Sequence, residues 1–150
     1  RFVVANPSRY LYLDDRRPDS GVFRTPPSSA RRACEGFDDY KYGLERLSAY
    51  MADTGAGRLR QQYGRRDVTL LLGAQDRERG GNLDRSCAAD LQGDNRLERG
   101  MLFYQYVVAQ YPPTGRHQLE VVPGIGHDGR AIFNAAAGRA ALFHGPGGAR

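Results

Sequence analysis

The sequence has little lysine and no long apolar run, and these two features limit the partners and the membrane topology that it can have. Lysine occurs once, at Lys41, so arginine supplies the other basic residues. These arginines alternate with acids, as in residues 76–79 and 96–99, whereas a nucleic-acid-binding surface gathers its positive charge on one stripe. We therefore expect no nucleic-acid partner, despite a formal net charge of +5. No segment is long and apolar enough to span a bilayer, so we expect no membrane span.

Cysteine is also scarce: Cys34 and Cys87 allow at most one disulfide. The spacing Cys-x-x-Cys does not occur, and no histidine lies near either cysteine in the sequence. A zinc site is therefore not expected, and we predict neither a metal nor a cofactor. In a cytosolic protein the two thiols would be free and buried.

What the sequence does contain is a pair of strand-to-loop junctions. Residues 68–72 (VTLLL) and 118–122 (QLEVV) have strand length, and each run ends at a glycine-containing loop. The first loop presents Asp76 and the second presents His127. In a parallel sheet, functional side chains collect beyond the carboxyl ends of the strands. There an imidazole can activate a hydroxyl nucleophile, while a carboxylate orients the imidazole and stabilises its charged form.

The order of these two residues, acid first and histidine later, is that of the last two triad members in an α/β-hydrolase. The serine motif Gly-x-Ser-x-Gly does not occur in the 150 residues. The sequence also lacks an initiator methionine and opens on an apolar strand that would be an exposed sheet edge. We therefore interpret the chain as the C-terminal part of a serine hydrolase whose nucleophile lies upstream of Arg1, and we expect it to be inactive alone.

Strands alternate with helices along the chain, which indicates an α/β fold with parallel strands and crossover helices. A loop and helical insertion is expected over residues 8–66, and residues 67–144 form the last strands and helices, which carry the acid and the base. Three prolines argue against a regular helix over residues 8–33. Apolar spacing predicts helices over 40–52, 58–63, 95–110 and 132–143, the third capped by Asn95 and closed by Pro112 and Pro113.

Five short segments stand out together: residues 6–12 (NPSRYLY), 40–44 (YKYGL), 72–76 (LGAQD), 92–100 (QGDNRLERG) and 124–128 (GIGHD). They resemble a bacterial family of largely uncharacterised α/β-hydrolases related to polyester depolymerases and esterases. The resemblance spans nearly the whole chain, from the opening strand to the last helix. It implies that Asp76 is the triad acid and that His127 is the base, but it does not identify a substrate; we expect a small-molecule or polymeric ester. The serine elbow of the family has no counterpart here.

The same resemblance bears on the two cysteines. Similar sequences carry cysteines at both positions, which implies a disulfide between Cys34 and Cys87 that ties the insertion to the loop behind Asp76. Because disulfides persist in oxidising compartments, this bond would favour a secreted or periplasmic protein.

The identity of the acid and the function itself have alternatives. Asp84 is a rival to Asp76, although it lies further from the end of the strand. Asp128 follows His127 directly and is expected to cap the last helix. The same fold could also host a non-catalytic binding or scaffold protein without a working triad.

Two further groups of residues have more than one interpretation. Arg96 and Arg99 are expected to pair with nearby acids on a solvated helix, or to hold an anionic group. Four tyrosines either line a cleft over the active site or pack the insertion against the core; they are Tyr10, Tyr12, Tyr40 and Tyr42.

Overall fold

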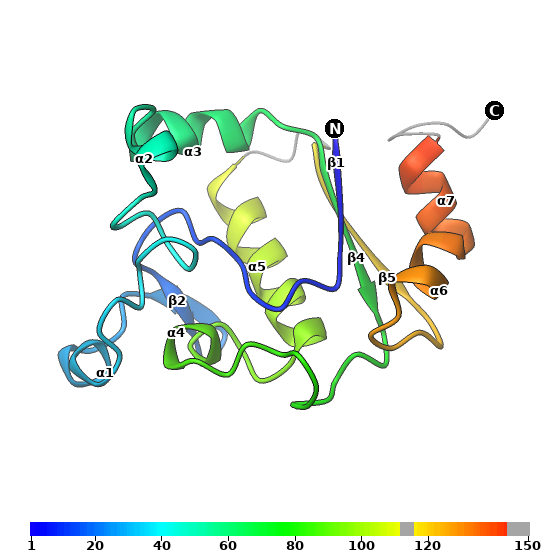
Figure 1. Cartoon of the computed structure of the whole chain (residues 1–150), viewed down its shortest axis with the longest axis horizontal. Helices are drawn as coiled ribbons and strands as arrows, with labels where there is room; N and C mark the ends of the chain where they lie inside the picture. The colour runs from blue at the N-terminus through cyan, green and yellow to red at the C-terminus, as the bar shows by residue number, and fades with distance from the viewer. Residues whose placement is uncertain (112–115, 144–150) are drawn as a thin grey trace.

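The computed structural model describes residues 1–111 and 116–143 and is built around a parallel sheet. The strands β1 (Phe2–Ala5), β4 (Val68–Gly73) and β5 (His117–Val122) pair in the order β1-β4-β5. Both pairings are parallel, so the carboxyl ends of the three strands lie together, at the lower end of the sheet as drawn in Figure 1. The predicted α/β architecture with parallel strands is confirmed.

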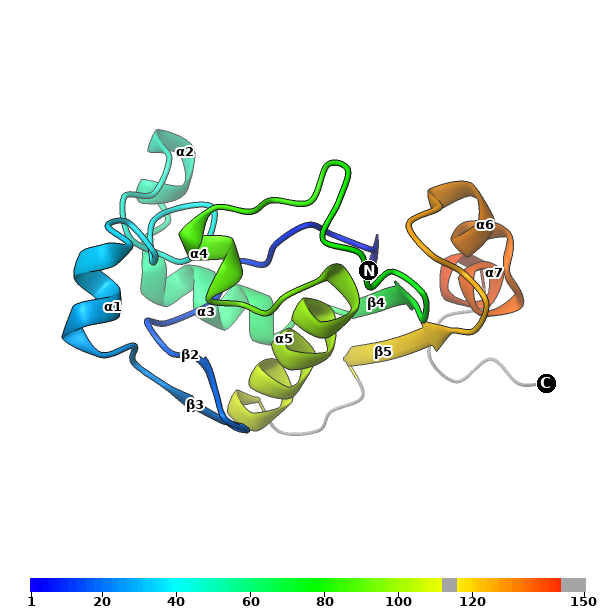
Figure 2. The same ribbon diagram turned by 90° about the horizontal axis from the view of Figure 1, so that it is seen from below.

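Helices cover both faces of this sheet. α5 (Arg96–Gln110) packs on one face, and α6 (Gly129–Asn134) with α7 (Ala136–Phe143) packs on the other, as Figures 1 and 2 show. Successive residues of the central strand therefore enter different cores: Leu70 lies in the cluster with α5, and Leu71 in the cluster with α6. This explains why β4 is apolar and buried at every position.

The segment between β1 and β4 lies on the α5 side of the sheet (Figure 2). It contains an antiparallel hairpin of β2 (Arg17–Asp19) and β3 (Val22–Arg24), followed by three helices. These are α1 (Ser28–Ala33), α2 (Ala49–Ala52) and α3 (Ala56–Gly64). A further short helix, α4 (Cys87–Asp90), follows β4 and precedes α5.

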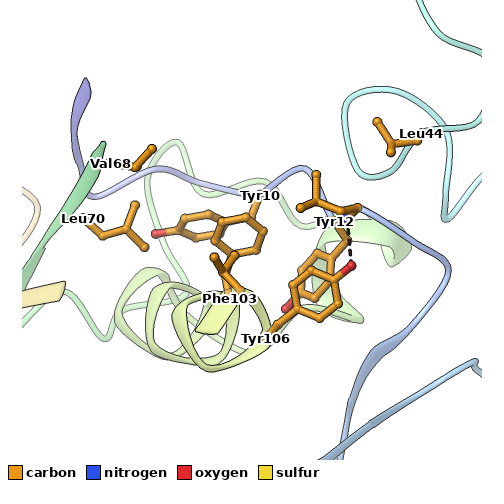
Figure 3. Close-up of a cluster of buried hydrophobic side chains, with 9 residues drawn as sticks. Tyr10, Tyr12, Leu44, Val68, Leu70, Phe103 and Tyr106 are labelled. Carbon is orange, nitrogen blue, oxygen red and sulfur yellow. Dashed lines mark hydrogen bonds between the residues drawn. The ribbon is translucent and has the colours of Figure 1, made fainter. Parts of the chain in front are cut away.

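Aromatic side chains attach the start of this segment to α5 (Figure 3). The ring of Tyr10 stacks on Phe103 with centroids 4.6 Å apart, and the ring of Tyr12 lies 4.6 Å from that of Tyr106. Both Tyr10 and Tyr12 are buried. Of the two interpretations of the tyrosines, packing against the core therefore holds for these two, whereas Tyr40 is exposed.

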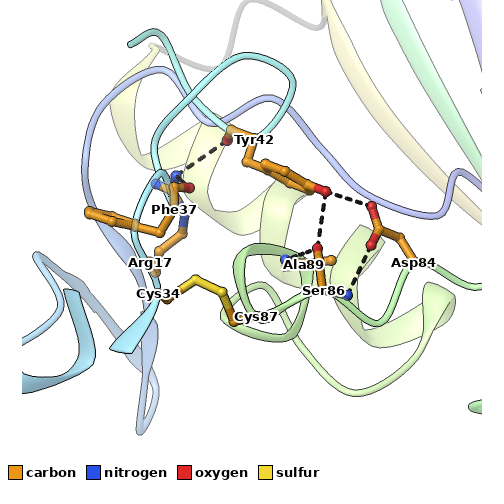
Figure 4. Close-up of a disulfide and its surroundings, with 8 residues drawn as sticks. All are labelled: Arg17, Cys34, Phe37, Tyr42, Asp84, Ser86, Cys87 and Ala89. Atoms are coloured by element: carbon orange, nitrogen blue, oxygen red, sulfur yellow. Dashed lines mark hydrogen bonds between the residues drawn. A yellow bond between two sulfur atoms is a disulfide. The ribbon is translucent and has the colours of Figure 1, made fainter. Parts of the chain in front are cut away.

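The predicted disulfide is present and joins the end of α1 to the start of α4 (Figure 4). The Cα atoms of Cys34 and Cys87 lie 5.7 Å apart. The bond thereby connects the segment before β4 to the chain that follows the Asp76 loop.

The helix predicted over residues 40–52 is wrong, because only Ala49–Ala52 is helical there. A tertiary interaction outweighs the local apolar spacing. The buried guanidinium of Arg17 donates hydrogen bonds to the carbonyl oxygens of Phe37 and Tyr42, 3.0 Å and 3.3 Å away. These bonds hold residues 37–42 in a compact loop. A continuous helix over residues 40–52 could not follow the path of this loop.

Two more predictions about helices need correction. The prolines do not exclude helix from residues 8–33, because α1 begins directly after Pro27, where a helix does not need the missing N–H. The helix predicted over 132–143 is two helices, interrupted by the extended backbone of Ala135. This break lets α7 fold back beside α6.

The other helix predictions are close to the structure. The helix expected over 58–63 is α3, and the helix expected over 95–110 is α5. As predicted, Asn95 caps α5: its side chain accepts a hydrogen bond of 3.0 Å from the Glu98 N–H. Pro112, Pro113 and the last residue of the 67–144 range lie outside the described residues.

Candidate functional site

Asp76 and His127 lie beyond the ends of the neighbouring strands β4 and β5, and their side chains are in contact. Nδ1 of His127 is 3.0 Å from Oδ2 of Asp76. The carboxylate is buried, with 3% of Asp76 exposed, whereas 43% of the His127 side chain is exposed. Within the described part of the chain, Nε2 of His127 has no hydrogen-bond partner. The pair therefore combines a shielded acid with an accessible imidazole.

Backbone contacts between the two loops fix this geometry. The N–H groups of Ala74 and Gln75 donate to the carbonyl oxygens of Val122 and Ile125, at 3.0 Å and 2.9 Å. Gly73 makes this approach possible, since a Cβ atom there would lie 2.6 Å from the carbonyl oxygen of Gly126. The glycine at the end of β4 is thus a requirement for packing as well as for turning.

Asn6 adds a side-chain tether from the end of β1. Its Oδ1 accepts a hydrogen bond of 2.8 Å from the Gly73 N–H, and its Nδ2 donates one of 3.2 Å to the Gly126 carbonyl. Asn6 is buried and has a φ of +43°, a conformation that asparagine tolerates better than most residues. One side chain thereby links the ends of all three strands. Sequence reasoning assigned no role to Asn6, although it opens the 6–12 segment and directly follows a strand.

The second oxygen of Asp76 faces Arg96. Nη1 of Arg96 lies 3.6 Å from Oδ1 of Asp76, and both side chains are almost completely buried. The next residue of α5, Leu97, donates its N–H to the Asp76 carbonyl oxygen at 3.2 Å. The prediction of a solvated helix face is therefore wrong for Arg96, because the first turn of α5 packs against the loop after β4.

The prediction of a solvated helix face is also wrong for Arg99, since its side chain is 0% exposed. Its guanidinium donates to the carbonyl oxygens of Gly93, Ser8 and Asp84, each at 2.7 Å, and to a carboxylate oxygen of Asp90 at 2.9 Å. Burial lowers the pKa of Arg99. Because these partners belong to the chain itself, Arg99 joins three segments rather than holding an external anion.

The rival acid, Asp84, lies in a different network (Figure 4). Its carboxylate accepts hydrogen bonds from the Ser86 N–H and the Tyr42 hydroxyl and pairs with Arg9 at 3.0 Å. Although burial raises the pKa of Asp84, these hydrogen bonds and the Arg9 charge lower it to about 2. Asp76 is the acid that contacts His127.

Asp128 is the N-cap of α6, as predicted. Its side chain accepts a hydrogen bond of 2.9 Å from the Ala131 N–H. The carboxylate next to His127 in sequence therefore has a structural partner of its own.

In residues 1–111 and 116–143, no three side chains of His, Cys, Asp or Glu gather in a way that could hold a metal ion. Across the same residues, no helix has both the length and the apolar character needed to cross a membrane.

Comparisons with known proteins identify relatives by structure only. No protein-family model matches the sequence, and no curated protein sequence does so either. The poly(3-hydroxybutyrate) depolymerase LpqC from Bordetella parapertussis matches 94% of this chain at 26% identity, with a TM-score of 0.61. Poly(aspartic acid) hydrolase-1 from Sphingomonas sp. KT-1 matches 84% of it, also at 26% identity, with a TM-score of 0.54. The chain spans 39% of the length of each, and its fold is similar to that of these α/β-hydrolase-fold depolymerases.

Proposed function

We propose that the chain is the acid- and base-bearing part of a serine hydrolase that cleaves carboxylic esters, with a serine supplied by sequence upstream of Arg1. The observation that carries this proposal is the 3.0 Å contact between His127 Nδ1 and Asp76 Oδ2, beyond two adjacent parallel strands. In a Ser-His-Asp triad the carboxylate keeps the proton on Nδ1, so that Nε2 can accept the serine proton. The exposure of His127 leaves Nε2 open to such a partner.

The reaction needs only these groups, an oxyanion hole and water. Nε2 of His127 takes the proton of the serine hydroxyl as its oxygen bonds to the ester carbonyl carbon. The protonated imidazole, stabilised by Asp76, then gives this proton to the departing alkoxide, leaving an acyl-serine. A water molecule, deprotonated by the same Nε2, then bonds to the acyl carbon, and the serine oxygen leaves and takes the proton back from the imidazole, which releases the acid and restores the serine.

The two solved proteins named above act on polymers, according to their names. Poly(3-hydroxybutyrate) is a polyester, so a polymeric ester is one candidate substrate and a small ester is the other. The Cys34–Cys87 disulfide supports an exported protein, because such bonds persist in oxidising compartments. A polymer outside the cell would be reached by such a protein.

The test uses the longer polypeptide that contains this chain, with a 4-nitrophenyl ester as substrate. We expect Asp76→Asn to lower kcat by about 10⁴-fold and His127→Ala to lower it by about 10⁶-fold. Asp128→Asn is the matched control, because asparagine is an equally good N-cap and the rate should stay unchanged. Undiminished turnover by folded His127→Ala and Asp76→Asn would refute the assignment of the triad residues, whereas a wild-type polypeptide without turnover would favour the scaffold interpretation. The 150-residue chain alone should show no turnover that depends on His127.

A further inference from the structure

We infer that Arg96 is a positioning residue for Asp76. Arg96 fixes the orientation of the Asp76 carboxylate, so that the negative charge of Asp76 is shared between Arg96 and His127. The inference rests on the proposed function for its role in catalysis. The coupling itself belongs to this chain and can be measured without a serine or a substrate.

The two oxygens of Asp76 face different partners. Oδ2 contacts Nδ1 of His127 at 3.0 Å, and Oδ1 lies 3.6 Å from Nη1 of Arg96. A buried carboxylate is strongly disfavoured unless a positive charge or several hydrogen bonds compensate it. A neutral imidazole supplies a hydrogen bond but no charge. Arg96 is therefore the compensating charge whenever His127 is in its basic, neutral form.

The surroundings of Arg96 support this role. Its Nη2 donates a hydrogen bond of 2.5 Å to Oδ1 of Asn82, whereas its buried Nε has no partner among the described residues. Arg99, one turn later, instead uses Nε and both terminal nitrogens for hydrogen bonds. The guanidinium of Arg96 is thus held by two contacts, the hydrogen bond to Asn82 and the ion pair with Asp76.

The other titratable groups near the pair do not replace this charge. Tyr10 approaches from the segment after β1, and burial, together with the charges of Tyr63, Tyr12 and Asp76, raises the pKa of its phenol, so that it stays neutral. Asp128, beside His127, uses its carboxylate to cap α6. Within the described part of the chain, Arg96 is the cation paired with Asp76.

Sharing the carboxylate has a measurable consequence for His127. The positive charge of Arg96 repels a protonated imidazole and so offsets part of the stabilisation that Asp76 gives to it. Removing the Arg96 charge should therefore make His127 hold its proton to higher pH. A purely space-filling Arg96 would leave this property unchanged.

The experiment is a pH titration of the histidine ring signals by NMR in the 150-residue chain. We expect Arg96→Met and Arg96→Gln to raise the titration midpoint of His127 by about one pH unit. Both variants remove the charge, and Arg96→Gln keeps a side chain that can donate hydrogen bonds. Arg96→Lys keeps the charge and should stay near the wild-type midpoint. Arg79→Met is the control, because Arg79 is an exposed arginine that pairs with Asp90 and Asp94.

An unchanged midpoint in either neutral variant, with a folded spectrum, would overturn the inference. So would a rise in Arg96→Lys as large as that in Arg96→Gln. If the midpoint rises while the longer polypeptide lacks His127-dependent esterase activity, the coupling stands and only the proposed function fails. If esterase activity is present but the midpoint is unchanged, the function stands and Arg96 is structural.

Discussion

His117, at the start of β5, is a half-buried histidine outside the candidate site. Its ring stacks on that of Tyr63, with centroids 5.2 Å apart, and its Nε2 lies 3.2 Å from the Tyr63 carbonyl oxygen. Burial lowers the pKa of His117 below its ordinary value of 6.5, and the Tyr63 carbonyl offsets only part of this effect. The folded protein therefore prefers the neutral ring.

This preference predicts how stability depends on pH. The unfolded chain binds a proton at His117 more readily than the folded chain does, so folding stability is lost as the pH falls through 6.5 and levels off below the lowered pKa. His117→Gln cannot be protonated and should lose less stability over this window. Urea unfolding of both proteins at a series of pH values checks this, and parallel pH dependences would contradict it.

At the scale of elements, the segment from Gln92 to Gly100 joins three parts of the fold. Gln92 is 0% exposed. Its side-chain oxygen accepts a hydrogen bond from the Tyr10 N–H, and its side-chain nitrogen donates one to the Tyr10 carbonyl oxygen, both at 2.7 Å. Gly100 lets α5 approach the sheet, because a Cβ atom there would overlap Leu72 and lie 2.7 Å from the Tyr10 hydroxyl oxygen. The segment holds α5, the strand β4 and the chain after β1 together.

This close approach predicts opposite effects for two Gly→Ala substitutions in helices. Gly100→Ala should lower the free energy of unfolding by about 1–3 kcal/mol, because the methyl group must displace Leu72 or Tyr10. Gly57→Ala in α3 meets nothing within 4 Å. It should raise the free energy of unfolding by up to about 1 kcal/mol through helix propensity. Urea unfolding measures both, and a stabilising Gly100→Ala would show that α5 packs less closely.

Local signals in the sequence were enough for some elements and not for others. The cap at Asn95 was predictable because its partner, the Glu98 N–H, lies three residues away. The contact of Gln92 with Tyr10 joins residues that are 82 apart in the sequence, so the local spacing of apolar residues could not predict it. The loop around residue 42 was mistaken for helix because the interaction that opposes the helix comes from the distant Arg17.

The candidate site shows the same division. Asp76 and His127 were identified because each follows an apolar strand, and their order matched a known arrangement. The roles of Asn6 and Arg96 depend on which strands and helices become neighbours. Such contacts exist only in the folded chain, so residue type and spacing could not assign them.

For the molecule as a whole, the disulfide constrains the long connection between β1 and β4. Cys34 and Cys87 are 53 residues apart, and closing a loop of this size stabilises the fold by about 4 kcal/mol at most. Reduction should therefore lower the Tm of the wild-type chain. A Cys34→Ser/Cys87→Ser variant should melt near the reduced wild type and ignore the reductant. Thermal unfolding with and without reductant checks this, and equal Tm values for oxidised and reduced wild type would refute it.

The unequal burial of Asp76 and His127 also bears on how such a chain could evolve. Asp76 and Arg96 pair inside the protein, so replacing either one alone removes the charge that compensates the other when His127 is neutral. His127 stands at the surface and carries no such obligation. If the proposed hydrolase activity were lost in a lineage, the histidine could be replaced by itself, while the acid and the arginine would have to be exchanged together.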